Sequence, residues 1–443
     1  MLGGWQRSPD IFGGSSLVES DLMRSRSSHG RANVLLEYIN KNYVSLNDDD
    51  MKKYGAEFRT VLDCIIQKMK EKNKKFNECY QRIFFAGSYW DGLKVGKPTE
   101  FDVDIVIKLP FIRNLIQETE KPRKEASQTT TKRTVKPTQF WQNVREILII
   151  CVNLHFCCIT SYFTSMLISR LLESLLDCRR YLTQSQLRMW MESVLHQALG
   201  CFPQEGDSWV LYDEKQPGRQ YMVKVRKSGP ALTLNILLLD GFRMDVDLVP
   251  VIELRCSEHL PYHFKLQQYS DRHDTFFIVP KPNKRLPKAD DCWRLAFHEQ
   301  ERAVLATYGA GIMKPVCRLL KKLRDTLDLP MLTSYYLKTL VMKVISEKED
   351  DRFFRNSLVN LFVHMLVVLK HQLGLGSINY FWDENYNLLE ECRREAVRHC
   401  YVRIKNVVED IQKNIEMDPL VLARNILNDE EFRSLPLDIV EYA

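Results

Sequence analysis

Several features that mark other classes of protein are missing from this sequence. None of its 12 cysteines belongs to a Cys-x-x-Cys pair, which excludes a small disulfide-bonded secreted scaffold and favours reduced thiols. The N-terminal stretch has no charged-then-apolar signal pattern, and Leu2 excludes N-myristoylation. We therefore expect a cytoplasmic protein, with a nuclear location left open. Residues 1–30 are rich in Gly, Ser and Arg, and we expect them to form a disordered leader.

A large excess of charge of one sign is also missing. The 63 Lys and Arg residues against 57 Asp and Glu give a net charge of only +6, so a nucleic-acid site would need a local basic patch. The stretch KMKEKNKKF carries one, formed by Lys68, Lys70, Lys72, Lys74 and Lys75. Such a run is either a solvated face or a surface that contacts phosphates. The polar, basic loop 121–138 adds a second cluster.

One long stretch lacks charged side chains and fits the surrounding pattern poorly. It covers residues 147–168, inside an apolar insertion at about 140–172. Three interpretations stay open: a buried or amphipathic helix, a membrane segment, or an insertion foreign to the fold, with polar residues inside the run counting against the membrane. His155, Cys157 and Cys158 have no further ligands at metal spacing, so we expect no zinc there.

Hydrophobic periodicity divides the rest of the chain into two parts. A helical pattern covers residues 31–77, and the strand-like stretches RIFFAG and EFDVDIVIKLP follow it. Residues 220–255 alternate between strands and turns, and the pattern is helical from Trp293 onward. The sequence therefore predicts an α+β fold, with a core at residues 31–290, a helical lobe at residues 291–443 and a cleft between the two.

Carboxylates gather on two of the predicted strands. Successive side chains of a strand alternate between its faces, so Glu100, Asp102 and Asp104 share one face. Downstream, FRMDVDLVPV repeats the arrangement with Asp245 and Asp247. Like charges on one face weaken a strand unless a cation compensates them. Because hard oxygen ligands suit Mg²⁺ or Mn²⁺, two neighbouring strands of this kind predict a metal site.

A Gly-Ser pair precedes the first acidic strand. Gly87 has no Cβ and lets the backbone approach a phosphate closely, while Ser88 offers a hydroxyl and an amide at a predicted helix start. Taken alone, the pair also fits a plain strand-to-helix turn. Its place before two acidic strands favours a triphosphate clamp.

Together, GS, EFDVDIV and the distant VDLV resemble the nucleotidyltransferase fold, and they are closest to cyclic GMP-AMP synthase and the animal cGAS-like receptors. The resemblance continues through residues 277–302, through VCRLLKKLRD and LTSYYLKT, and through residues 378–390. It implies a mixed twisted sheet with a long N-terminal spine helix, a C-terminal helical lobe, and an active-site cleft between them.

The resemblance also implies roles for single residues. Glu100, Asp102 and Asp247 match the catalytic triad that binds two Mg²⁺ or Mn²⁺ ions, and Asp104 and Asp245 are additional to it. The residues that match nucleotide contacts are Gly87, Ser88, Arg294, Lys322, Ser334 and Tyr335. The lysines of KMKEKNKKF match the position of a surface that docks nucleic acid.

The function implied is the synthesis of a cyclic dinucleotide, a cyclic GMP-AMP isomer, from ATP and GTP for a downstream receptor of innate immunity. The stretch ATYGAGIMKPVCRLLKK contains one cysteine, Cys317, where DNA-sensing vertebrate relatives carry a zinc insertion. The resemblance is then to the zinc-free insect-type branch, for which double-stranded RNA is the expected activator. Membrane attachment is not expected. The 2′ or 3′ linkage and a ligand-induced dimer stay open, as do two alternatives: an RNA-end nucleotidyltransferase and a non-catalytic nucleic-acid-binding protein.

Overall fold

The computed structural model describes residues 30–109, 166–178, 181–213, 218–256, 274–281, 290, 293–348 and 351–442. The expectations for the leader, the basic loop and His155, Cys157 and Cys158 fall outside these residues, as does all but the end of the apolar run. The chain divides into two units, Leu46–Ala303 and Met1–Ser45 with Val304–Ala443, and each is described by itself.

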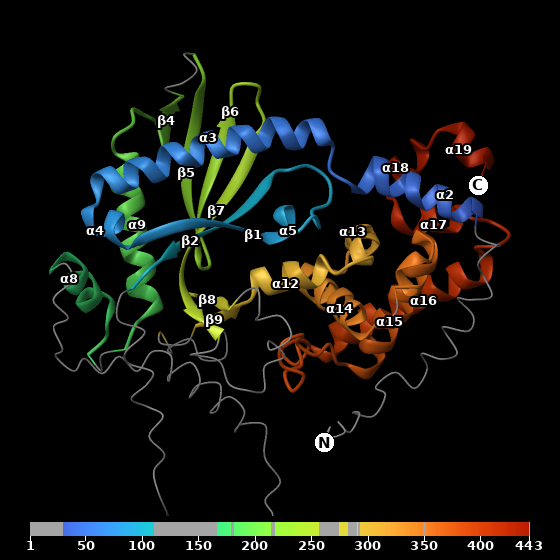
Figure 1. The fold of residues 1–443 in the computed structure, drawn as a ribbon. Helices are drawn as coiled ribbons and strands as arrows, with labels where there is room; N and C mark the ends of the chain where they lie inside the picture. The colour runs from blue at the N-terminus through green and yellow to red at the C-terminus, as the bar shows by residue number, and fades with distance from the viewer. Residues whose placement is uncertain are drawn as a thin grey trace, which may run out of the picture. The chain divides into compact units, whose positions relative to one another are not determined.

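The first unit is built on a mixed sheet, which confirms the predicted α+β core (Figure 1). Its described strands are β1 (Tyr80–Ala86), β2 (Glu100–Ile107), β3 (Gln204–Glu205), β4 (Ser208–Tyr212), β5 (Gln220–Ser228), β6 (Ala231–Leu238), β7 (Arg243–Arg255), β8 (Thr275–Val279) and β9 (Arg294–Ala296). They lie in the order β1-β2-β7-β6-β5-β4-β3, and β8 joins β7 to β9. The β2–β7 pair is parallel and the other pairs are antiparallel.

The predicted spine helix is α3 (Asp48–Lys72), which crosses the sheet in blue in Figure 1. Asn47 caps its first turn by accepting hydrogen bonds from two backbone amides. Its apolar side chains recur at helical spacing, and Phe58 stacks on Phe101 of β2 with ring centroids 4.3 Å apart. The apolar face of β2 is therefore covered by α3, which leaves the alternate, acidic positions facing the other way.

Among the described residues of this unit there are four further helices, and a fifth crosses the boundary of the unit. They are α4 (Lys74–Cys79), α5 (Gly87–Trp90), α8 (Met166–Leu175), α9 (Gln184–Leu199) and, at the boundary, α12 (His298–Leu305). The helical pattern predicted to run through residue 77 breaks at Asn73, whose side chain accepts a hydrogen bond from the backbone amide of Phe76 and so starts α4. The side of the sheet that α3 covers also carries α9, because α3 packs against α9.

The second unit is helical, as expected. Its described elements are α2 (Gly30–Ile39), η1 (Asn40–Val44), η2 (Ala310–Ile312), α13 (Met313–Thr326), α14 (Ser334–Glu347), η3 (Phe353–Arg355), α15 (Leu358–Leu375), α16 (Arg394–Asn414), α17 (Leu420–Ile426), α18 (Asp429–Arg433) and α19 (Leu437–Tyr442). The helix α2 packs on α15 and α17, so residues 30–45 belong with the C-terminal helices.

The core of this unit is α15. It is apolar over most of its surface, and 67% of it is buried inside the unit. Among the described helices it is the only one long and apolar enough to cross a membrane, and its burial is that of a core helix. Ser357 caps its start and Gly376 ends it in the left-handed conformation at φ 66°.

Candidate active site

The two acidic strands lie side by side in the sheet. In the parallel ladder of β2 and β7, Asp102 stands opposite Asp247 and Glu100 stands opposite Asp245. These four carboxylates line one pocket of about 270 Å³. The alternation read from the sequence explains the common face, and the pairing of the strands brings the two faces together.

The fifth carboxylate of the pattern, Asp104, is not part of this pocket. It is 5% exposed, and one of its oxygens lies 3.3 Å from Nε2 of His298 at the start of α12. From Val103 onward, the residues on both faces of β2 are buried. Asp104 therefore does not reach the pocket, although it shares a face of the strand with Glu100 and Asp102. Asp104 thus lies outside the pocket, in agreement with the prediction that it is not part of the triad.

Two of the carboxylates in the pocket already have cationic partners. Glu100 accepts a hydrogen bond from Nζ of Lys94 at 2.6 Å, and this lysine is largely buried. Asp245 accepts one from the amide of Asn235 at 2.6 Å, and Arg226 lies 3.5 Å from it. The negative charge that lacks a cationic partner in the described pocket is thus concentrated on Asp102 and Asp247.

Burial and the neighbouring negative charges together change the acidity of Asp102. Burial of its carboxyl group, followed by the negative charges of Asp247 and Asp104, raises its pKa to about 6. A cation bound nearby would stabilise the charged form of this carboxyl group.

The Gly87–Ser88 turn stands directly over Asp102. Gly87 starts α5 after β1, and it has a φ of 79°, which side-chain-bearing residues rarely adopt. A Cβ at this position would lie 1.8 Å from Oδ2 of Asp102. The missing side chain lets the backbone of the turn approach this carboxylate directly, so the amides of the turn lie beside Asp102.

The turn is fixed at both of its ends by Arg302 of α12, a residue that the sequence reasoning did not single out. Its Nε donates a hydrogen bond to Asp91 at 2.9 Å, at the end of α5, and its guanidinium also donates to the carbonyl of Phe85. A pairing across more than 200 positions leaves no local signal in one sequence. Lys94 was missed for a simpler reason, because a single lysine in a turn is unremarkable there.

The residues fit a divalent cation at Asp102 and Asp247, although the set is not complete as it stands. Among the described residues, no group of three or more His, Cys, Asp or Glu side chains is arranged to hold a metal. Asp102 and Asp247 are paired across the ladder, whereas Glu100 is turned to Lys94. A third ligand would therefore require Glu100 to exchange Lys94 for the ion.

Removing the charge of Asp102 is expected to stabilise the metal-free protein in a pH-dependent way. Its pKa is raised from 3.8 to about 6 in the folded state, so the stability cost is absent below pH 3.8, grows between these values and is complete above pH 6. Solvent in the open pocket screens the effect. We expect Asp102→Asn to raise the unfolding free energy by about 1 kcal/mol at pH 7.5 in chelator, and by almost nothing near pH 4. Urea denaturation at both pH values measures this, and equal effects at both would contradict it.

The predicted nucleotide-contact residues of the helical unit lie on α13 and α14. Ser334 begins α14, and its Oγ accepts a hydrogen bond from Arg324 at 3.0 Å. Tyr335 is half-buried, with its ring centroid 6.3 Å from that of Tyr380. Lys322 on α13 is paired with Glu431 at 2.5 Å, so its charge is already balanced within this unit. The nucleotide roles of these residues stay predictions.

Arg294 lies in the same unit as the carboxylates. It is the first residue of β9, opposite Val279 of β8, and its side chain is exposed. No ion pair joins it to another described residue. This leaves its guanidinium accessible, which the predicted contact with a base edge requires.

The five lysines of KMKEKNKKF lie at the end of α3 and on α4. Lys68 is paired with Glu71 at 3.1 Å, and Nζ of Lys70 lies 4.1 Å from the ring centroid of Tyr80. Lys72 and Lys74 are exposed, and Lys75 is half-buried. The accessible positive charge of this run is therefore centred on Lys72 and Lys74.

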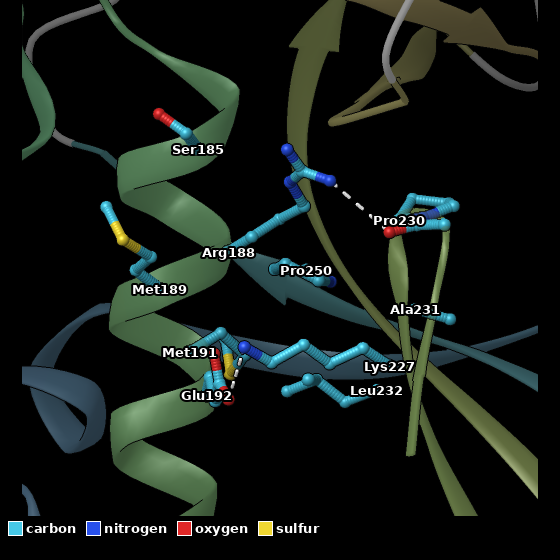
Figure 2. A pocket seen from close by; sticks show the side chains of 11 residues that line it. Ser185, Arg188, Met189, Met191, Glu192, Lys227, Pro230, Ala231, Leu232 and Pro250 are labelled. Carbon is cyan, nitrogen blue, oxygen red and sulfur yellow. Dashed lines mark hydrogen bonds and ion pairs between the residues drawn. The ribbon is translucent and has the colours of Figure 1, made fainter.

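A second pocket lies on the α9 side of the sheet (Figure 2). Arg188 of α9 donates a hydrogen bond to the carbonyl of Gly229 at 3.3 Å, and Lys227 is paired with Glu192 at 2.9 Å. Lys227 points here, whereas its neighbours Arg226 and Ser228 line the acidic pocket, as alternation along β5 requires. These contacts tie α9 to the β5–β6 turn.

A mixed sheet with two acidic strands over one pocket, followed by a helical unit, defines a nucleotidyltransferase. The sequence matches the Mab-21 protein nucleotidyltransferase domain over residues 89–307 and the Mab-21 protein HhH/H2TH-like domain over residues 312–406. The chain belongs to the Mab-21 nucleotidyltransferase family.

Its relatives include proteins described as cyclic GMP-AMP synthase-like receptors. One from Aethina tumida is 33% identical, with 90% of this chain and 92% of that protein aligned. One from Trichogramma pretiosum is 30% identical over 91% of this chain and 77% of that protein, and one from Ctenocephalides felis is 30% identical over 92% and 90%. The resemblance to cGAS-like receptors is therefore confirmed, together with the fold class.

Proposed function

We propose that this protein joins ATP and GTP into a cyclic dinucleotide, a cyclic GMP-AMP isomer, which acts as a second messenger of innate immunity. The observation that carries the proposal is the pairing of Asp102 with Asp247 across β2 and β7, beside a glycine turn whose backbone approaches Asp102 closely. The names of the relatives support the choice of product.

The reaction is a phosphoryl transfer in which positioning and charge neutralisation supply most of the rate. A ribose hydroxyl forms a bond to the α-phosphorus of the second nucleotide while the bond to pyrophosphate breaks, and a second transfer closes the ring. Glu100, Asp102 and Asp247 would hold two Mg²⁺ or Mn²⁺ ions, which neutralise phosphate charge and favour loss of the hydroxyl proton when bound. The Gly87–Ser88 turn would receive the triphosphate through its backbone amides and the serine hydroxyl.

Further nucleotide contacts are proposed for Arg294 of the first unit and for residues of the helical unit. Arg294 has an accessible guanidinium that can pair with the acceptors of a guanine edge. Tyr335 would stack on a base and Ser334 would bind a polar group beside it. Lys322 could reach a phosphate only after it separates from Glu431.

Double-stranded RNA is the proposed activator. Lys72 and Lys74 can follow a phosphate backbone without reading its sequence. Cys317 lies buried in α13, and the described residues around it offer no cluster of zinc ligands. The cytoplasm, where such RNA would be met, is the proposed location.

Product analysis tests the proposed function. Purified full-length protein is incubated with labelled ATP and GTP and Mn²⁺ or Mg²⁺, without nucleic acid, with double-stranded RNA, or with double-stranded DNA. We expect a phosphatase-resistant dinucleotide that depends on RNA. Label in long RNA would instead show an RNA-end nucleotidyltransferase, and RNA binding without any product would show a non-catalytic binding protein.

The same assay tests the RNA surface. Lys72→Glu combined with Lys74→Glu is expected to weaken RNA binding by about tenfold and to reduce its dependence on salt, because two phosphate contacts are lost. Lys52→Glu combined with Lys53→Glu is the matched control, since both are exposed lysines near the other end of α3 and the change in net charge is the same. Equal losses of RNA affinity in both variants would show that only the net charge of the protein matters, and not the position of these lysines.

A further inference from the structure

The strand β6 presents polar side chains to the acidic pocket from the side opposite β2. In its antiparallel ladder with β7, Thr233 stands opposite Asp247 and Asn235 stands opposite Asp245. Their neighbours Leu232 and Leu234 point to the other face, so the two polar residues share the face of the carboxylates. Asp247 is thus flanked by Asp102 on one side and by Thr233 on the other.

The hydroxyl of Thr233 donates a hydrogen bond to Oδ1 of Asp247 at 2.5 Å, which is the short distance of a charge-assisted bond. Thr233 is 1% exposed, in a strand whose inner residues are otherwise mostly aliphatic. A hydroxyl is costly in such a place unless it has a partner, and a valine would fill the same volume without that cost. Asp247 is the acceptor that accounts for a threonine here.

We infer that Thr233 is a positioning residue for Asp247: it holds Oδ1, fixes the plane of the carboxylate and leaves Oδ2 directed to the divalent cation. This inference rests on the proposed function. Carboxylates that bind metals are commonly held by outer hydrogen bonds, and losing such a bond typically weakens metal binding by about 10- to 100-fold. Glu100, the first member of the proposed triad, has a partner of a different kind, because Lys94 balances its charge.

The test compares Thr233→Val and Thr233→Ser with the wild-type chain. Mn²⁺ affinity is measured directly, from the electron paramagnetic resonance signal of free Mn²⁺, and dinucleotide synthesis is measured at limiting and saturating Mn²⁺. We expect Thr233→Val to weaken Mn²⁺ binding by about tenfold, and Thr233→Ser, which keeps the hydroxyl, to remain within about threefold of wild type. Synthesis by the valine variant should recover largely at saturating Mn²⁺.

Asn235→Ala is the matched control, because Asn235 lies on the same face of β6 and holds Asp245 in the same way. Its Mn²⁺ affinity should stay within about twofold, since Asp245 is outside the proposed triad. Urea denaturation of each variant reports folding. A purely structural role would lower stability without changing Mn²⁺ affinity.

Three results would overturn the inference. The first is an unchanged Mn²⁺ affinity in folded Thr233→Val. The second is equal losses in the valine and serine variants, because the serine variant keeps the hydroxyl and its loss would show that the hydroxyl does not account for the effect. The third is absence of Mn²⁺ binding and of product in the wild-type chain, which would remove the proposed function as well. If Asp247→Asn abolishes Mn²⁺ binding while Thr233→Val does not, the proposed function stands and this inference alone fails.

Discussion

Asp247→Asn is expected to lower dinucleotide synthesis by at least about a hundredfold, because it removes a charged oxygen ligand and leaves Asp102 facing a neutral amide. The isosteric change keeps the hydrogen-bonding capacity toward Thr233. Folding is therefore expected to survive, and loss of repulsion between the two carboxylates favours the folded state. Initial rates with ATP, GTP and Mn²⁺, together with urea denaturation, measure both effects.

The control for this prediction is Asp245→Asn, two positions away on the same strand and in the same pocket. Asp245 is already held by Asn235 and Arg226, so we expect synthesis to fall by less than about tenfold. RNA binding should be unchanged in both variants because α3 is untouched. A loss in Asp245→Asn as large as that in Asp247→Asn would show that the triad has been assigned to the wrong residues.

The second large effect is expected from Gly87→Ala, which should also lower synthesis by about a hundredfold or more. The added methyl group would lie 1.8 Å from Oδ2 of Asp102, so either the turn or the carboxylate must move. Displacement by about 1 Å at a reacting centre can cost about a hundredfold in rate. The change should raise the KM for nucleotide as well as lower kcat, because Gly87 faces both the proposed triphosphate and the metal ligand. Steady-state kinetics separates the two contributions.

Gly96→Ala separates the clash from backbone strain. Gly96 has a φ of 77°, almost the same as the 79° of Gly87, but a Cβ there would meet nothing within 4 Å. We expect it to lose about 1 kcal/mol of stability and to keep most of the activity. If Gly87→Ala were as active as Gly96→Ala, the closeness of the turn to Asp102 would have no functional role.

Much of the fold could be predicted because its signals are local. The helical spacing of apolar residues identified α3, and period-two alternation identified β2 and β7 together with their acidic faces. Even the polar face of β6 had a signal, since Thr233 and Asn235 alternate with leucines in the same way as Asp245 and Asp247 alternate with apolar residues. That signal was not used because neither side chain is ionisable.

Other features have no local signal. The helical pattern of residues 31–77 did not show that residues 30–45 pack with the C-terminal helices. The sequence also showed no sign that Lys322 is paired with Glu431 or that Arg302 secures the turn before β2. Each of these contacts joins residues more than 100 positions apart. A partner at that distance depends on how the elements pack.

The sequence by itself determined which residues share a face, because the period of a strand is a property of its own backbone. It thereby placed five carboxylates on two strand faces. The tertiary structure decided which strands are neighbours and in what register, so that Asp102 meets Asp247 while Asp104 is buried beside His298. Register depends on packing of the apolar faces against α3 and on the neighbouring strands, and those are contacts between distant parts of the chain.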